Sequence, residues 1–331
     1  MLQFRASVIQ KLRNFFINKN YLELDTPALS PTLIPENCLE VFSTDYIEPW
    51  ANKRKTLYLV PSPEIFIKKI IAKYKTDVFQ LSKCYRNVES VGSIHSPEFT
   101  MLEYYTMNAD YRDSMEITEK MIESLLPPLS GNETEDPLHF FRPPFTRLTM
   151  DEAFRKYAGF SLDECTHQKD LVNHARKLGI TEFDNNPFSK WGWDDLYELI
   201  LVQCVEPGLK NETKATFLID YPAKVPCLAK TNGLHKERWE LYCCGVELAN
   251  CYSEETDSKE IREYFKNEGK IKNKTAIVPH AIDDEYYKTF EDFPECSGVA
   301  MGVDRLIMLL TGQKSIESII PFPFRLKTGY Y

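Results

Sequence analysis

Two carboxylates in one short segment, Glu240 and Glu247, are the first candidates for chemistry. On one continuous strand, residues seven apart would face opposite sides. A turn at Cys244-Gly245 would instead place the two on adjacent strands of a hairpin, facing the same side. Two carboxylates on one face, with few positive residues nearby, suit a Mg²⁺ ion that bridges ATP phosphates. An exposed pair of surface acids would give the same pattern.

A second candidate site surrounds a polar loop between two expected strands, residues 78–85 and 98–105. Arg86 opens this loop, and His95 and Phe99 lie at its far end. A guanidinium group suits phosphate, and an aromatic ring suits stacking on a base. The sequence therefore indicates a nucleotide site, with a solvated hairpin around a core phenylalanine as the alternative.

A third candidate is the polar row formed by Asn250, Tyr252 and Glu254. Alternate residues of a strand share one face, so an amide, a phenol and a carboxylate would lie together. Such a face suits recognition of an amine, because all three groups can accept hydrogen bonds. An exposed polar strand face remains the alternative.

The fourth candidate is the run of small residues from Ser297 to Arg305, which includes Gly302. Small residues allow a backbone to approach a ligand closely. Arg305 would lie at a helix start, where the helix dipole and the guanidinium both favour phosphate. A chance match to Gly-x-Asp-Arg would carry no such meaning.

The surrounding pattern predicts an α+β fold with a mainly antiparallel sheet, because the strands are joined mostly as hairpins. Helices are expected at residues 4–19, 63–72, 111–126, 255–271 and 304–310, with a largely helical stretch at 149–210. Strands are expected at 21–25, 57–60, 78–85, 98–105, 216–220 and 297–303, with a hairpin at 239–250. Residues 127–145 are expected to form a surface loop.

Composition indicates a globular protein without a membrane span or a secretory signal. The 331 residues are 43% hydrophobic and 27% charged, with a net charge of -9. Nine cysteines without a Cys-x-x-Cys pair argue against disulfides or zinc and favour the cytoplasm. The absence of a basic tail makes tRNA an unexpected partner, although a local basic patch would weaken that objection.

Taken in order, these segments resemble the three signature motifs of class II aminoacyl-tRNA synthetases. The similar segments are residues 12–28, 79–105 and 298–309. The stretches 96–103, 216–222 and 245–250 are similar to the lysyl-tRNA synthetase subclass. The resemblance therefore implies the class II catalytic fold, with an antiparallel sheet flanked by helices.

Within that subclass, the chain resembles truncated paralogues that attach lysine or (R)-β-lysine to elongation factor P, a protein shaped like tRNA. The first motif begins within a dozen residues, which leaves no room for an N-terminal OB-fold that binds the anticodon. We therefore expect one catalytic domain over residues 1–331. Ser62 and Ala249 replace the usual Ala and Gly of lysyl-tRNA synthetases, and both are expected at the amino-acid pocket.

The resemblance also implies roles for individual residues. Arg86 and Arg305 would act in catalysis by holding phosphates, and Glu240 and Glu247 would hold Mg²⁺. The residues expected to bind ATP are Arg86, Asn87, Glu89, His95, Phe99, Glu240, Glu247, Gly302 and Arg305. The residues expected to bind the amino acid are Ser62, Glu64, Glu103, Tyr105, Ala249, Asn250, Tyr252 and Glu254.

The chain departs from the family pattern in the second motif, which usually reads Arg-Asn-Glu. Here Val88 is inserted before Glu89, so either a bulge restores the carboxylate or its contact is lost. Cys251 and Tyr252 replace the usual Gly and Phe. Two other functions stay open at this point: a free-standing synthetase that charges tRNA, and an inactive regulatory module. A homodimer is expected by analogy with the family.

Overall fold

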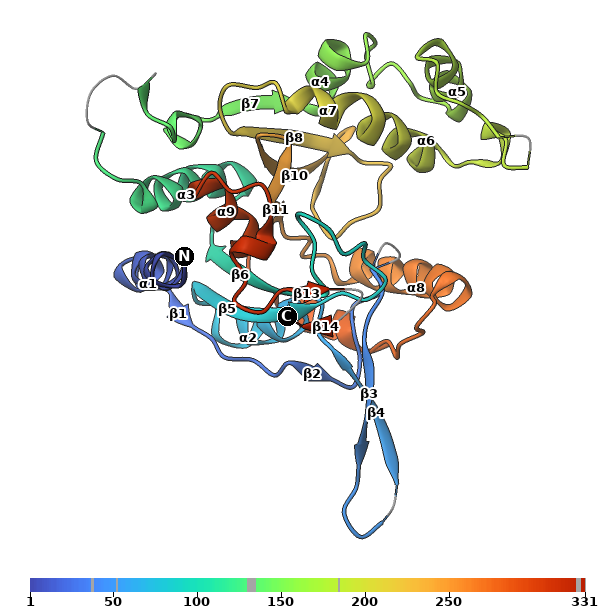
Figure 1. The fold of residues 1–331 in the computed structure, drawn as a ribbon. Coiled ribbons are helices and arrows are strands. Elements are labelled where there is room, and N and C mark those ends of the chain that lie inside the picture. The colour runs from blue at the N-terminus through green and yellow to red at the C-terminus, as the bar shows by residue number, and fades with distance from the viewer. Residues whose placement is uncertain (37–38, 52, 130–134, 184, 326–328, 331) are drawn as a thin grey trace. The chain divides into compact units, whose positions relative to one another are not determined.

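The computed structural model describes residues 1–36, 39–51, 53–129, 135–183, 185–325 and 329–330 (Figure 1). These residues divide into two units, which we call the first unit, Met1–Ser114 with Ser253–Tyr331, and the second unit, Met115–Tyr252. Both ends of the chain thus belong to the first unit. The expectation that residues 1–331 act as one catalytic domain stays a prediction.

The sheet of the first unit has the strand order β1-β5-β6-β12. Its strands are β1 (Leu22–Glu23), β5 (Val78–Tyr85), β6 (Glu98–Met107) and β12 (Cys296–Gly302). The pairs β5–β6 and β6–β12 are antiparallel, as predicted, whereas β1 is parallel to β5. The difference arises because a long crossover separates β1 from β5, and such a connection allows parallel pairing.

One face of this sheet is apolar and packs on helix α1 (Leu2–Asn18). The ring of Phe16 is fully buried and lies 5.1 Å from the ring of Phe79 and 4.7 Å from that of Tyr104. Phe79 and Tyr104 are register partners on β5 and β6, so they share this face. Apolar residues spaced as on a helix face predicted this helix correctly.

A buried polar contact joins α1 to the start of helix α9 (Val303–Leu310). Arg5 Nη1 lies 2.5 Å from Asp304 Oδ1, and the backbone N–H of Thr100 donates to Asp304 Oδ2 at 2.7 Å. Arg5 also donates to Thr100 Oγ1 at 2.8 Å. Asp304 is 2% exposed, so these donors compensate for its lost hydration. The contact fixes where α9 begins.

Helix α2 (Glu64–Tyr74) also belongs to the first unit, as do α8 (Ser258–Thr275) and the short helix η5 (Tyr286–Phe290). The Phe265 and Tyr286 rings stack with centroids 5.1 Å apart, which packs η5 on α8. The C-terminal elements are η6 (Ile316–Ser318), β13 (Phe324–Arg325) and β14 (Gly329–Tyr330).

A separate small sheet of the first unit has the order β2-β4-β3. Its strands are β2 (Leu29–Ser30), β3 (Ser43–Ile47) and β4 (Arg54–Leu59). Figure 1 shows the β3–β4 hairpin projecting from the rest of this unit. The strand expected at 57–60 is the buried end of β4, and β3 was missed because all five of its residues are exposed.

The sheet of the second unit has the order β11-β10-β8-β7, with β9 (Thr231–Asn232) beside β10. Its other strands are β7 (Thr146–Thr149), β8 (Thr216–Pro222), β10 (His235–Cys243) and β11 (Val246–Ser253). The predicted turn lies between β10 and β11, where Cys244 and Gly245 have φ angles of 53° and 76°. Positive φ at two central residues is typical of a tight hairpin turn.

The region predicted to be mostly helical, 149–210, folds around a cluster of buried apolar side chains. Its elements are α4 (Met150–Tyr157), α5 (Gln168–Lys177), η3 (Phe188–Lys190), α6 (Trp193–Ile200), the π-helical turn η4 (Leu201–Val205) and α7 (Glu206–Leu209). Helix α3 (Tyr111–Leu125) leads into the second unit. The expected loop 127–145 includes η2 (His139–Phe141), and its residues 130–134 lie outside the described part.

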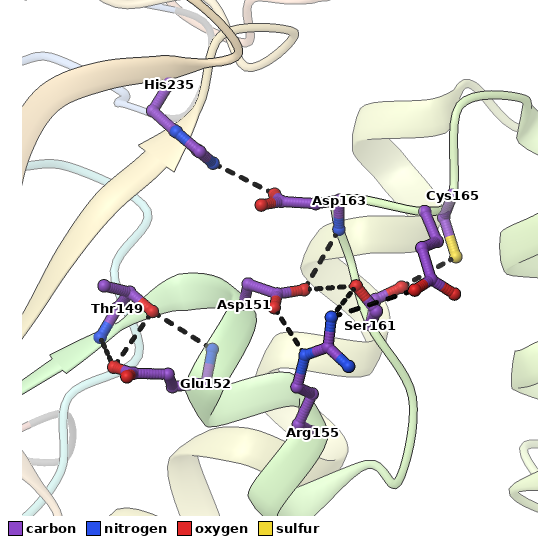
Figure 2. A network of polar contacts seen from close by, with 9 residues as sticks. Thr149, Asp151, Glu152, Arg155, Ser161, Asp163, Cys165 and His235 are labelled. Carbon is purple, nitrogen blue, oxygen red and sulfur yellow. Dashed lines mark hydrogen bonds and ion pairs between the residues drawn. The ribbon is translucent and has the colours of Figure 1, made fainter.

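Polar contacts fix the start of α4, as Figure 2 shows. Thr149 and Glu152 form a reciprocal capping box at the first turn of this helix. Asp151 accepts hydrogen bonds from Arg155 Nε at 2.6 Å and from Ser161 Oγ at 2.7 Å. The Asp163 backbone N–H donates to the same carboxylate at 3.1 Å.

Among the described residues, no helix is long and apolar enough to cross a membrane.

Candidate active site

The second face of the first unit's sheet carries the polar residues predicted from sequence. Phe99, Glu103 and Tyr105 are alternate residues of β6 and therefore share one face. Glu103 and Tyr105 pair with Ala300 and Gly298 of β12, so small residues lie beside them on that face. The strand alternation thus brings the predicted nucleotide residue and two predicted amino-acid residues onto one surface.

Arg86 lies against Phe99, with its guanidinium carbon 5.2 Å from the ring centroid. Its Nε is buried and has no hydrogen-bond partner among the described residues. A buried guanidinium N–H without a partner costs free energy unless an acceptor binds it. The geometry therefore suits an anion such as a phosphate at Arg86.

The loop after Arg86 answers the question raised by the inserted residue. Val88 has a φ of 60°, a left-handed conformation that β-branched residues rarely adopt. This kink leaves Glu89 3.8 Å from Arg86 Nη1 and 3.9 Å from His95 Nε2. A bulge at Val88 therefore keeps the carboxylate beside Arg86.

Asn87 holds the same loop to the segment before β3. Its backbone N–H donates to the Glu40 carbonyl at 2.8 Å, and its side-chain amide donates to the Val41 carbonyl at 3.2 Å. The side chain expected to bind ATP thus has a structural contact in this protein. Its contribution to ATP binding stays a prediction.

Three positive or titratable side chains, Arg86, His95 and Arg305, lie around this loop. Arg305 Nε donates to the Ile94 carbonyl at 3.1 Å, which ties the start of α9 to the loop. Burial of the imidazole, followed by the charge of Arg305, lowers the pKa of His95. His95 is therefore neutral near pH 7, with one ring nitrogen able to donate. Gly302 is the residue that caps α9.

The amino-acid residues predicted in the first unit gather with Lys68 in a buried and partly buried group that we call the acid cluster. Its members are Ser62, Glu64, Lys68, Glu103, Tyr105 and Glu254. Ser62 Oγ donates to Glu103 Oε1 at 2.5 Å, and Tyr105 Oη lies 3.4 Å from Glu103 Oε2. A Cβ at Gly298 would come within 2.4 Å of Glu254 Oε1 and of the Tyr105 ring. Only glycine at this position allows that close approach.

Lys68 is the member of the cluster that sequence analysis missed. Its side chain is fully buried, and its Nζ bonds Glu64 Oε1 and lies 2.7 Å from Glu254 Oε2. The spacing of four residues between Glu64 and Lys68 on a helix was the available signal. We had assigned Glu64 and Glu254 only to the substrate, whereas each already contacts a resident ammonium group.

The carboxylates of this region resist ionisation. Burial, followed by the charge of Glu64, raises the pKa of Glu103 to about 8. Burial raises the pKa of Glu254 to about 7, although Lys68 opposes the shift. Burial and Glu64 likewise raise the pKa of Glu36 to about 7. In the acid cluster one ammonium group, that of Lys68, faces the three carboxylates of Glu64, Glu103 and Glu254, and this excess of negative charge suits a cationic ligand.

In the second unit, the β10–β11 hairpin places Glu240 and Glu247 on one face, as predicted. Glu240 pairs with Asn250, and continuing that register would pair Glu247 with Cys243, on the other face. The register shifts at Leu241/Tyr242, so Glu247 pairs with Tyr242 instead. A β-bulge, not the turn alone, therefore brings the two carboxylates to the same side.

One positive residue, Arg238, lies beside Glu240. Arg238 Nη2 lies 2.5 Å from Glu240 Oε1, and Tyr242 Oη donates to Glu240 Oε2 at 2.8 Å. Arg238 Nε also donates to Asn250 Oδ1 at 3.1 Å, and its guanidinium carbon lies 5.5 Å from the Tyr252 ring centroid. A carboxylate has about four lone-pair sites, so these donors leave room for a hard cation.

Ala249 lies on the opposite face of β11 from Asn250 and Tyr252. It pairs with Leu241 and is 2% exposed, whereas its neighbour Asn250 pairs with Glu240. Adjacent strand residues point to opposite faces, so the Ala249 methyl points away from Asn250 and Tyr252. The expectation that this methyl lines the amino-acid pocket stays a prediction.

Comparison with known proteins agrees with this geometry. A family model described as tRNA synthetases class II (D, K and N) matches residues 1–326. The chain belongs to this family. Its predicted class II catalytic fold, α+β with helices around the sheets, is thereby confirmed.

Curated relatives place the chain within this class II family more closely. The elongation factor P–(R)-β-lysine ligase of Proteus mirabilis is 33% identical over 324 residues, covering 96% of this chain and 93% of that protein. The ligase of the same name from Vibrio cholerae is 32% identical, covering 98% and 95%. The lysine–tRNA ligase of Wigglesworthia glossinidia brevipalpis is also 32% identical, but the match covers only 63% of that enzyme. The resemblance to the truncated lysyl-type ligases is confirmed.

Proposed function

We propose that this class II protein is an ATP-dependent ligase that activates (R)-β-lysine or lysine and transfers it to a lysine side chain of elongation factor P. The observation that carries the proposal is the acid cluster, whose residues Glu103 and Tyr105 lie on the same sheet face as Phe99. Arg86 in turn lies against the Phe99 ring. Relatives that cover nearly the whole chain and are named for this reaction support it.

In the first step, a carboxylate oxygen of the amino acid attacks the α-phosphorus of ATP. A bond forms between that oxygen and phosphorus, the bond to the bridging oxygen breaks, and pyrophosphate leaves. No enzyme nucleophile is required, since positioning and charge stabilisation suffice. Arg86, with its unpartnered Nε, would stabilise the negative charge that develops on the α-phosphate.

In the second step, the amine of the acceptor lysine attacks the carbonyl carbon of the adenylate. An amide bond forms, the bond from carbonyl carbon to phosphate oxygen breaks, and AMP leaves with its electron pair. The amine must lose a proton to attack, so the transfer rate should rise toward the ordinary lysine pKa near 10.4.

The remaining residues would bind and orient the two substrates. His95 and Arg305 would contact the outer phosphates of ATP, and Phe99 would stack on adenine. Glu240 and Glu247 would hold Mg²⁺, which supplies neutralising charge to the phosphates when bound. The acid cluster would hold the amines of the amino acid, because its carboxylates exceed its positive charge.

The experiment that tests the reaction is the mass of elongation factor P after incubation with the enzyme, ATP, Mg²⁺ and candidate amino acids. We expect a mass increase of one lysine or β-lysine residue and magnesium-dependent ATP–pyrophosphate exchange. If no amino acid stimulates exchange above background, the protein is not an activating enzyme.

The similarity to lysine–tRNA ligases favours one second candidate, a free-standing synthetase that charges tRNA. Matched assays with tRNA-Lys and elongation factor P separate the two functions. Efficient charging of tRNA with no mass added to the factor would establish the synthetase instead. We expect the reverse, and we also propose a homodimer, which sedimentation would test.

Arg86→Ala and Arg305→Ala should each slow adenylate formation about a hundredfold, because one preorganised contact to a developing oxyanion contributes roughly 3 kcal/mol. Both side chains are partly exposed, so the melting temperature should change little. Pyrophosphate exchange measures the rate. Full activity in either variant would remove that residue from the mechanism.

A further inference from the structure

Lys68 is a fully buried lysine on α2, one turn after Glu64. Burial alone would lower the pKa of its amine, yet the nearby charges of Glu254 and Glu64 raise that pKa well above the ordinary value. The side chain therefore stays charged inside the protein. Its charge faces the residues to which the amino-acid substrate is assigned.

The contacts of Lys68 use one oxygen from each of two carboxylates. Its Nζ bonds Oε1 of Glu64 and lies 2.7 Å from Oε2 of Glu254. The other oxygen of Glu254, Oε1, faces Gly298, where a Cβ would approach it to 2.4 Å beside the Tyr105 ring. One oxygen of Glu254 thus lies beside Lys68, and the other lies beside Gly298 near the Tyr105 ring, whose hydroxyl is 3.4 Å from Glu103 Oε2.

We propose that Lys68 is a positioning residue for the amino-acid substrate, which holds Glu64 and Glu254 so that one oxygen of each faces a different amine of a diamino acid. This inference rests on the proposed function. It differs from the roles of the carboxylates themselves, because Lys68 would act through Glu64 and Glu254, which its amine contacts.

Stability alone is a poor explanation for this arrangement. Buried ion pairs lose much of their attraction to the cost of removing both charges from water, and apolar replacements are often neutral. Here one buried lysine also serves an excess of carboxylates, since Glu103 is buried close by. A group that orients two carboxylates for an incoming cation explains both the burial and the uneven charge.

The test compares Lys68→Met with Lys69→Met in pyrophosphate exchange. Methionine is an unbranched side chain one atom shorter than lysine, and it removes the charge. Lys69 is the matched control, since its side chain is 44% exposed and pairs with Asp283 at 3.1 Å. Exchange is measured while the amino acid and ATP are varied separately, and the melting temperature of each variant is recorded.

We expect Lys68→Met to raise the KM for the amino acid about 10- to 100-fold, as for loss of a charged hydrogen-bond network. The KM for ATP should stay within about twofold, and kcat at saturating amino acid within about threefold, because the phosphate contacts are unchanged. Lys69→Met should behave as wild type. Equal rises in both KM values, or no change in either, would overturn the proposal.

A measurement on the wild type decides the matter if Lys68→Met does not fold. In protein with ¹⁵N-labelled lysine, a buried ammonium gives a slowly exchanging Nζ signal, assigned by its absence in Lys68→Arg. This signal should shift on addition of the amino acid and stay unchanged with ATP alone. A signal unaffected by an amino acid that does stimulate exchange would refute the role of Lys68 while leaving the proposed function intact. Absence of exchange with every amino acid would instead refute the proposed function.

Discussion

The acid cluster of the first unit and the Asp151 network of the second unit use similar side chains but differ in charge balance. Around Asp151, one arginine, one hydroxyl and one backbone N–H satisfy a single carboxylate (Figure 2). In the acid cluster, one lysine serves Glu64 and Glu254 while Glu103 is buried nearby. The first arrangement is complete without a ligand, and the second is short of positive charge.

The pKa shifts of the two networks have opposite signs for this reason. Burial would raise the pKa of Asp151, but its hydrogen bonds from Arg155 and Ser161 outweigh burial and lower it. Burial dominates at Glu103 and raises its pKa. A lowered carboxylate pKa stabilises the fold, whereas a raised one weakens it at neutral pH. The comparison teaches that unbalanced buried charge, and not polarity as such, marks the functional region.

The largest expected effect comes from Glu103→Gln, which removes a carboxylate from the unbalanced network. We expect the KM for the amino acid to rise about a hundredfold, since a buried ammonium loses a charged partner. At pH 8.5 the melting temperature should not fall, because the excess of buried negative charge is reduced. Exchange kinetics and thermal unfolding check both points. A raised KM for ATP alone would show that the amino-acid pocket lies elsewhere.

The pH dependence of substrate binding should follow the same carboxylates. Glu254 and Glu36, with pKa values of about 7, and Glu103, with one of about 8, are protonated in the free protein at low pH. An ammonium substrate requires them ionised, so its KM should fall about tenfold or more between pH 6.5 and 8.5. A KM that is constant over this range would contradict the assignment.

Stability should respond to the same rise in pH in the opposite direction. A carboxylate whose folded pKa is raised loses its favourable contribution as pH rises from the unfolded value, here 4.5, through the folded one. The free protein should therefore become less stable up to about pH 8, and bound amino acid should offset the loss. Thermal melts with and without the amino acid measure this difference.

Asp151→Asn tests the balanced network and should have a smaller, purely structural effect. We expect a loss of about 1–2 kcal/mol in the free energy of unfolding, because Arg155 loses its charged acceptor. The wild-type contribution should be present at neutral pH and disappear as pH falls below the ordinary aspartate value. Chemical denaturation measures the loss, and the KM for both substrates should stay unchanged. A changed KM would break the distinction between the networks.

The smallest expected effect belongs to Ala249→Gly. The resemblance places this methyl at the amino-acid pocket, where one methyl group changes the choice between lysine isomers by about 1–3 kcal/mol. Because the methyl points away from Asn250 and Tyr252, we now expect the ratio of exchange rates for the two isomers to change less than about threefold. A shift of tenfold or more toward α-lysine would restore the original expectation.

Strong local patterns explain what could be predicted from the sequence. β5 was predicted with its observed bounds and β6 nearly so, because both are bounded by polar loop residues. The β3 strand was missed, since its exposed residues show no alternation. Contacts between residues far apart in the sequence could not be predicted from local patterns either. Arg5 and Asp304, for example, form an ion pair although they are 299 positions apart.

Within the site, residue types were predicted better than their arrangement. Glu64, Glu103 and Glu254 were chosen as partners of an amine, and the structure does surround an ammonium with two of them. That ammonium belongs to Lys68, which was overlooked although helix periodicity places it one turn after Glu64 and on the buried face of α2. Strand pairing likewise decides on which side Ala249 points, and register is a property of two strands together.

The bulge between Glu240 and Glu247 limits how the length of this hairpin can change. Deleting one residue from β11 near Leu248 would restore regular pairing and turn Glu247 to the opposite face. Adding a residue at the Cys244-Gly245 tip, between the two strands, would lengthen the loop and leave both carboxylates where they are. We therefore expect insertions in this segment to be tolerated at its tip. In its strands, an insertion or deletion should separate the two carboxylates even though neither side chain is replaced.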